Sequence, residues 1–158
     1  GENLTNGDLV GTKDGSAYGL VFDPQDENVF YFSNNDKHCI YKYDLRTKEC
    51  ACWAGQEGKS GYLDGPIGQA MFNKPGQMCV DSEGNIILTD TENHCIRKIT
   101  MSTGYVSTLA GKPQNSGYVN GSAEDAQFKK PLGICIDNDD VMYIGDSENR
   151  AIRRLAVE

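Results

Sequence analysis

Two histidines, His38 and His94, are the side chains of this 158-residue chain that first suggest catalysis or metal binding. Imidazole is a general acid–base group near neutral pH and a common zinc ligand. Such a site needs its ligands to converge, but these two hold equivalent positions of an internal repeat, and the next copy carries Arg150 there. We therefore interpret both histidines as turn-flanking residues and expect no catalytic residue and no cofactor.

The densest acidic cluster, Asp137-Asn138-Asp139-Asp140, is a candidate calcium loop, because Ca²⁺ takes several oxygen ligands from one loop. The glycine and distal glutamate of an EF-hand loop are absent, and the other copies of the repeat have a plain turn here. Asp137, Asp139 and Asp140 are thus a weak metal candidate, and a turn is the favoured interpretation.

A second set of polar residues recurs in matching positions of the second and third copies: Asp90, Asn93, Arg97, Asp146, Asn149 and Arg153. Asp and Asn side chains bond nearby backbone N–H groups in Asx turns, and Asn tolerates the left-handed region. These residues recur because every copy of the repeat needs the same turn. We predict structural roles for the set, with the arginines paired to acidic neighbours on the same or an adjacent unit.

Six cysteines are a low density for a disulfide scaffold, and no zinc-type pair of Cys-x-x-Cys motifs is present. Cys79 and Cys135 occupy equivalent apolar strands, where a thiol acts as a small hydrophobe. Cys50 and Cys52 point to one face of a strand. A bond from Cys39 to either of them depends on the hairpin register, which the sequence leaves open.

The repeat itself has a fixed period of 56 residues. The segment 34–42 returns at 90–98 and again at 146–154, and Ala54–Pro75 returns as Ala110–Pro131. Each unit contains short apolar runs separated by turn residues, which predicts four strands per unit. Four antiparallel strands repeated radially are the plan of a β-propeller, whereas a solenoid unit brings fewer strands.

We therefore predict an all-β fold of β-propeller blades, about three blade equivalents, or half of a six-bladed ring. The whole segment 1–158 divides into 4–11 (fourth strand of a blade), 17–54 (blade), 55–75 (linker), 76–110 (blade), 111–131 (linker) and 132–155 (three strands of a blade). Three blades cannot close a ring of six. Either the chain is part of a longer protein, or two copies complete the ring as a homodimer.

Strand alternation places the turn between the second and third strands at the same end as the fourth-to-first linker. Loops at one end of a rigid scaffold are the usual site of binding residues. The candidate binding residues of this top face are His38, His94, Arg150, Tyr62, Asp64, Tyr118 and Asn120.

The segment Asp81–Ile99 closely resembles the NHL repeat, and so does the linker pattern of Tyr105–Pro131. The similarity extends over residues 17–155, and the first copy departs most, with Asn34 and Tyr41 in place of Asp90 and Arg97. The resemblance implies a propeller, commonly six-bladed, that serves as a binding platform. The long linkers are similar to those of bacterial surface or envelope NHL proteins, and this resemblance implies an extracellular or cell-envelope location.

The preferred functional hypothesis is a non-catalytic binding or scaffold module that presents turn and linker loops to a protein, peptide or glycan. A propeller hydrolase or lyase with a metal in the central channel is the alternative, but the inner strands are mainly apolar. RNA binding is least favoured, because 15 basic against 23 acidic residues give a net charge of −8. No apolar run approaches the roughly 18 residues of a membrane span.

Overall fold

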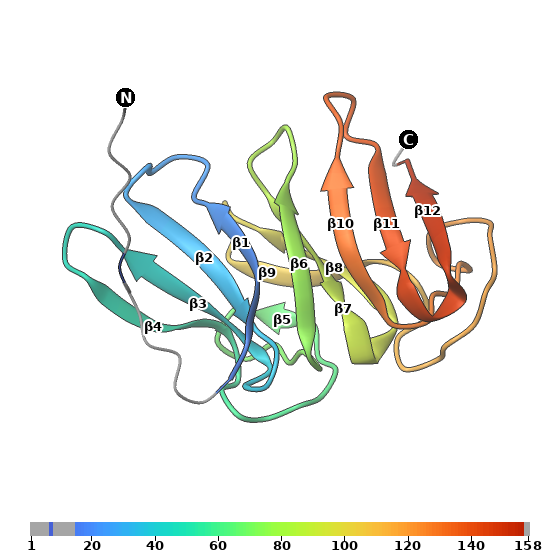
Figure 1. Cartoon of the computed structure of the whole chain (residues 1–158), viewed down its shortest axis with the longest axis horizontal. Coiled ribbons are helices and arrows are strands. Elements are labelled where there is room, and N and C mark those ends of the chain that lie inside the picture. The colour runs from blue at the N-terminus through green and yellow to red at the C-terminus, as the bar shows by residue number, and fades with distance from the viewer. Residues whose placement is uncertain (1–6, 8–14, 157–158) are drawn as a thin grey trace.

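The first sheet is a complete four-stranded blade. In this computed structural model, which describes residues 7 and 15–156, it comprises β1 (Ala17–Phe22), β2 (Val29–Asn34), β3 (Cys39–Asp44) and β4 (Glu49–Gly55). The strands are antiparallel in the order β1-β2-β3-β4 (Figure 1). The strand predicted at 4–11 lies, apart from Gly7, outside the described residues.

The second sheet has five strands, in the order β5-β9-β8-β7-β6. Their bounds are β5 (Gly65–Pro66), β6 (Pro75–Val80), β7 (Ile86–Asp90), β8 (Cys95–Thr100) and β9 (Tyr105–Ala110). The short strand β5 comes from the linker and pairs with β9 through Gly65 and Val106. The strand β5 could not be predicted from the sequence, because a two-residue strand has no periodicity to detect.

The third sheet has three strands, β10 (Pro131–Ile136), β11 (Met142–Asp146) and β12 (Ala151–Leu155). Two single-turn 3-10 helices, η1 (Thr91–Asn93) and η2 (Ser147–Asn149), precede β8 and β12. The predicted all-β class and the antiparallel blades are confirmed. No helix among the described residues is long and apolar enough to cross a membrane.

The three blades stack through their faces, with β1, β6 and β10 side by side (Figure 1). Apolar side chains of the first and second sheets share one core, which includes Tyr31, Ile40 and Leu88. A second core joins the second and third sheets through Ile87, Ile96 and Ile144. The strands of the second blade are apolar on both sides because the first and third blades cover its two faces.

Hydroxyl groups also bridge neighbouring blades. Ser33 donates a hydrogen bond of 2.6 Å to the carbonyl oxygen of Gly76, and Thr89 donates one of 2.8 Å to that of Leu132. A Cβ atom at Gly76 would lie only 2.5 Å from the Thr89 hydroxyl oxygen. Glycine at position 76 is therefore required by the close approach of β6 and β7.

The turn between the second and third strands of each described blade ends on a residue in the left-handed region. His38 and His94 have φ of 56°, and Arg150 has φ of 51°. Asparagine tolerates this conformation, but no asparagine adopts it at these three turns. Asn93 and Asn149 lie inside the 3-10 turns, and the left-handed residue comes directly after them.

Candidate functional site

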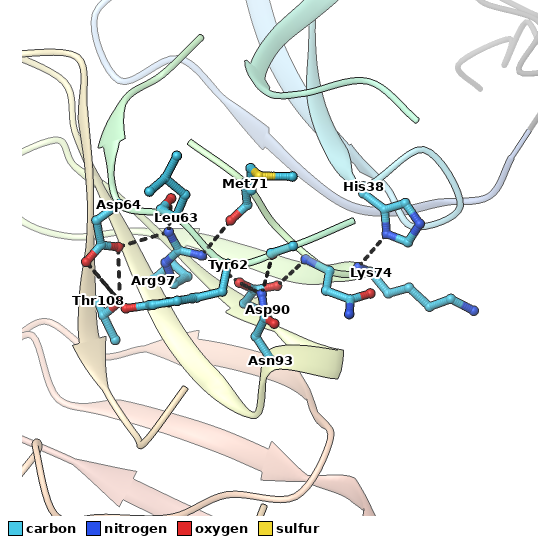
Figure 2. A network of polar contacts seen from close by, with 12 residues as sticks. His38, Tyr62, Leu63, Asp64, Met71, Lys74, Asp90, Asn93, Arg97 and Thr108 are labelled. Atoms are coloured by element: carbon cyan, nitrogen blue, oxygen red, sulfur yellow. Dashed lines mark hydrogen bonds and ion pairs between the residues drawn. The ribbon is translucent and has the colours of Figure 1, made fainter. Parts of the chain in front are cut away.

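The centre of the second blade is a buried arginine. Arg97 on β8 donates from Nη1 to the Asp90 carboxylate (2.7 Å) and to the carbonyl of Met71 (2.9 Å). Its Nη2 donates to Asp64 (2.9 Å) and to the carbonyl of Leu63 (2.8 Å) (Figure 2). One guanidinium thus ties the strands β7 and β8 to two points of the linker that runs from β4 to β6.

Asp90 completes this arrangement from the end of β7. Its Oδ2 also accepts from the Asn93 amide (2.8 Å), and its Oδ1 accepts from the backbone N–H of Asn73 (2.8 Å). The Asn93 amide donates in turn to the carbonyl of Gly61 (2.8 Å). The Asx-turn interpretation is therefore wrong for Asp90, whose carboxylate makes no cap bond to its own turn and reaches the linker instead. Burial raises the pKa of Asp90 to about 6, against the opposing effect of Arg97.

The third blade repeats the arrangement with one change of charge. Arg153 donates to Asp146 (2.8 Å), and Asn149 donates to the same carboxylate (2.7 Å). Where Arg97 meets Asp64, Arg153 meets the neutral Asn120 (2.9 Å). The second blade therefore has two carboxylates around one guanidinium, and the third has one.

Linker aromatics cover both arginines. The Arg97 Cζ lies 4.7 Å from the ring centre of Tyr62 and 5.0 Å from that of Phe72. Arg153 lies in the same way against Tyr118 (4.7 Å) and Phe128 (4.8 Å). Planar guanidinium groups stack favourably on aromatic faces. Four of the predicted top-face residues, Tyr62, Asp64, Tyr118 and Asn120, are thus partners of the buried arginines.

The two histidines contact the ends of the linkers. His38 Nδ1 accepts a hydrogen bond of 3.0 Å from the backbone N–H of Lys74, and His94 Nδ1 accepts one of 3.0 Å from that of Lys130. Burial lowers the pKa of both imidazoles. The turns and linkers do meet at one end of the blades, while the histidines lie on successive blades and Arg150 on a third.

The acidic cluster of the third blade forms a turn. Asp137 accepts from the backbone N–H groups of Asp139 (2.9 Å) and Val141 (3.0 Å). Asp140 accepts from the backbone N–H (2.9 Å) and the hydroxyl of Ser82 on the second blade. Over residues 15–156, no group of three or more His, Cys, Asp or Glu side chains is placed to hold a metal ion.

A hollow of about 430 Å³ lies where β9 passes into the second linker. Residues that line it include Tyr62, Thr108, Lys112, Asn115, Ala123 and Glu124. Sequence reasoning missed Lys112, Asn115 and Glu124. No signal marks them, because the equivalent positions of the preceding linker are Gln56, Lys59 and Gly68.

Residues 72–99 match the NHL repeat family. NHL repeat-containing protein 2 of Gallus gallus is 30% identical over 152 residues, which are 95% of this chain and 19% of that protein. A solved Bacteroides thetaiotaomicron protein of unknown function is 33% identical with a TM-score of 0.84, covering 94% of this chain and 36% of that one. A solved auxiliary nutrient binding protein from the same species is 33% identical with a TM-score of 0.74, covering 85% and 36%.

The chain thus spans about a fifth of the chicken relative and little more than a third of these two solved chains. The repeat of 56 residues, the stacked antiparallel blades and the recurring Asp-Asn-Arg arrangement agree with these similarities. The chain belongs to the NHL-repeat family of β-propeller proteins.

Proposed function

We propose that this chain is a non-catalytic binding module whose ligand enters the hollow beside Tyr62. The observation that supports the proposal is the position of this hollow, at the end of the blades where linkers and turns meet. A similar solved protein is described as an auxiliary nutrient binding protein, which favours a nutrient-type ligand over a catalytic substrate.

The lining of the hollow favours a polar ligand. Its polar lining residues are Tyr62, Thr108, Lys112, Asn115 and Glu124. A few convergent polar groups beside an aromatic ring give orientation and specificity in ligand sites. We propose a glycan as the ligand, because its hydroxyl groups both donate and accept hydrogen bonds. A peptide or a protein loop is the alternative outcome of the test.

Tyr62 is held in place before any ligand arrives. Its ring lies against Arg97, and its hydroxyl contacts that of Thr108 (2.5 Å). Thr108 and Asp64 are also hydrogen-bonded to each other (3.1 Å). A ring fixed in this way loses little conformational freedom on binding, which favours affinity.

The experiment is a calorimetric titration with neutral oligosaccharides and, separately, with a mixed peptide library. Asn115→Ala and Lys112→Ala remove polar groups of the hollow, and Lys59→Ala is the matched control at the position equivalent to Asn115 in the preceding linker. We expect an oligosaccharide to bind and each hollow variant to weaken it about tenfold, as for a lost hydrogen bond of about 1.4 kcal/mol. If all three variants changed the affinity equally, the assignment of the binding site to this hollow would be contradicted.

Large apolar side chains are exposed on the two outer faces of the blade stack. Leu20 of the first blade is 59% exposed and Ile152 of the third is 76% exposed, whereas Ile96, the equivalent of Ile152, is fully buried between blades. We propose that further NHL blades of a longer parent chain cover these faces. Light scattering tests this proposal, because a mass of twice 17.3 kDa at all dilutions would indicate instead a ring of two copies.

A further inference from the structure

Two cysteines of the first blade lie on one face of neighbouring strands. The register pairs Tyr41 of β3 with Cys52 of β4, and Cys39 is two residues before Tyr41. Alternate residues of a strand share a face, so Cys39 and Cys52 are diagonal neighbours on the same side of the sheet. The Cys52 thiol donates a hydrogen bond of 3.6 Å to the carbonyl oxygen of Gly55, the residue that pairs with Cys39. We infer that Cys39 and Cys52 form a reversible disulfide that cross-links β3 to β4, a function separate from ligand binding.

The strand pair is irregular at this point. The register shifts between Ile40 and Tyr41, so Ile40 pairs with Ala54 while Tyr41 pairs with Cys52, which leaves Trp53 as the extra residue of β4. Bulges of this kind bend the strand and redirect side chains. The irregularity therefore lies between the two cysteines, in the part of β4 that must accommodate the bond.

The two thiols differ in access and acidity, which gives each a separate role. Cys39 is fully buried and Cys52 is partly exposed. The neighbouring Cys39 thiol lowers the pKa of Cys52, whereas the Cys52 thiol and burial raise the pKa of Cys39. An accessible thiol of lowered pKa is the attacking group in thiol–disulfide exchange, and its buried neighbour is the resolving group.

The second blade shows what the same positions do without a second thiol. Cys95 is the equivalent of Cys39, and Thr108 is the equivalent of Cys52. Cys95 is fully buried, and burial raises its pKa. The Thr108 hydroxyl is hydrogen-bonded to Tyr62 and Asp64. Cys95 is thus a natural control for a buried strand thiol without a partner.

The cross-link would fall in the blade that lacks the buried arginine. Tyr41 replaces Arg97 in the first copy, and its hydroxyl donates to Glu57 of the following linker (2.5 Å). A covalent bond between β3 and β4 would hold the outer strand at the point where this linker begins. In the other two described blades, Arg97 and Arg153 hold the linker by hydrogen bonds instead.

The chemistry is a two-electron exchange with a small disulfide such as oxidised glutathione. The Cys52 thiolate attacks one sulfur of the reagent, which forms a mixed disulfide and releases one glutathione thiolate. Cys39 then loses its proton to water and attacks the Cys52 sulfur, which releases the second glutathione thiolate. Two protein thiols are oxidised and one reagent disulfide is reduced to two thiols.

The test exposes the chain to oxidised glutathione and maps its disulfides by mass spectrometry after digestion. We expect a single intramolecular bond between Cys39 and Cys52, reversed by dithiothreitol. The Cys50→Ser and Cys95→Ser variants should form the same bond. A bond from Cys50 to either cysteine, a bond between Cys79 and Cys135, or oxidation that stops at the mixed disulfide would overturn the inference.

A second readout guards against misfolding of the Cys39 variant. Iodoacetamide should alkylate Cys52 faster than Cys50 at neutral pH, and Cys39→Ala should slow the alkylation of Cys52 because the neighbouring thiol that lowers its pKa is removed. The circular dichroism of that variant reports whether it is folded. Unchanged Cys52 alkylation in a folded Cys39→Ala variant would contradict the pairing of the two thiols.

Discussion

Arg97 donates a hydrogen bond of 2.7 Å to Asp90, and both side chains are completely buried. The same guanidinium also binds the carbonyl oxygens of Leu63 and Met71 in the linker. A buried charge pair is costly to break, because removing one partner leaves the other charged and without solvent. The long linker is therefore fixed to its blade by an interaction inside the fold, and Tyr62 is positioned with it.

Arg97→Met should destabilise the chain by about 3–5 kcal/mol, because Asp90 would be left as a buried charge without its counter-ion. Urea unfolding gives the free energy. Arg46→Ala is the control, since Arg46 pairs with Asp26 at a similar distance (2.7 Å) on the surface. That exposed pair should contribute far less to stability, because solvent screens it. If Arg97→Met cost no more than Arg46→Ala, the buried pair would not be what holds the linker.

The contribution of His94 to stability should fall as the pH drops below 6.5, the ordinary pKa of histidine. His94 accepts through a neutral Nδ1, and burial lowers its pKa in the folded state. Above pH 6.5 the imidazole is neutral in both states and contributes no pH dependence. Below that value the unfolded chain binds the proton first, so the folded state loses stability until the lower folded pKa is reached.

The comparison that isolates this effect is with His94→Asn, measured by urea unfolding from pH 8 to pH 5. Asparagine tolerates the left-handed backbone of position 94 and does not titrate. The raised pKa of Asp90 acts in the opposite sense below pH 6 but is common to both proteins. The difference in stability between the parent and the variant should shift in favour of the variant as the pH falls. A difference that is constant with pH would be the contrary result.

Gly76→Ala should destabilise the chain by about 1–3 kcal/mol, as expected for overpacking. The new methyl group would approach the Thr89 hydroxyl oxygen to 2.5 Å and a Leu132 methyl carbon to 3.0 Å, where two blades meet. Gly68→Ala is the control, because nothing lies within 4 Å of a Cβ there. Thermal unfolding of the two variants compares them, and equal melting temperatures would refute the tight contact.

The blades could be predicted from the sequence because their signals are local and repeated. The apolar strands and the 56-residue period are visible without any structure, and they give the all-β propeller class. The pairing of Arg97 with an acidic neighbour, on the same or an adjacent blade, was also expected. The joint replacement of Asp90 and Arg97 by Asn34 and Tyr41 in the first copy is the signal that these two residues act together.

The candidate site was less accessible to sequence reasoning because its contacts join residues distant in the chain. Asp90 was expected to serve its own turn, yet it binds the backbone of Asn73, 17 residues away. The linker residues Tyr62 and Asp64 were predicted to bind a ligand. In the structure both contact Arg97. Only the folded linker shows that Lys112 and Asn115 line a hollow.

The most direct test of the central claim is an NMR titration of the ¹⁵N-labelled chain with the oligosaccharide that binds in calorimetry. We predict saturable shift changes clustered at Tyr62, Thr108, Lys112 and Asn115, with half-saturation at about tenfold higher ligand concentration in Asn115→Ala but not in Lys59→Ala. Shift changes confined to other parts of the blades, or saturable binding that Asn115→Ala leaves unchanged, would contradict the assignment of the binding site to this hollow.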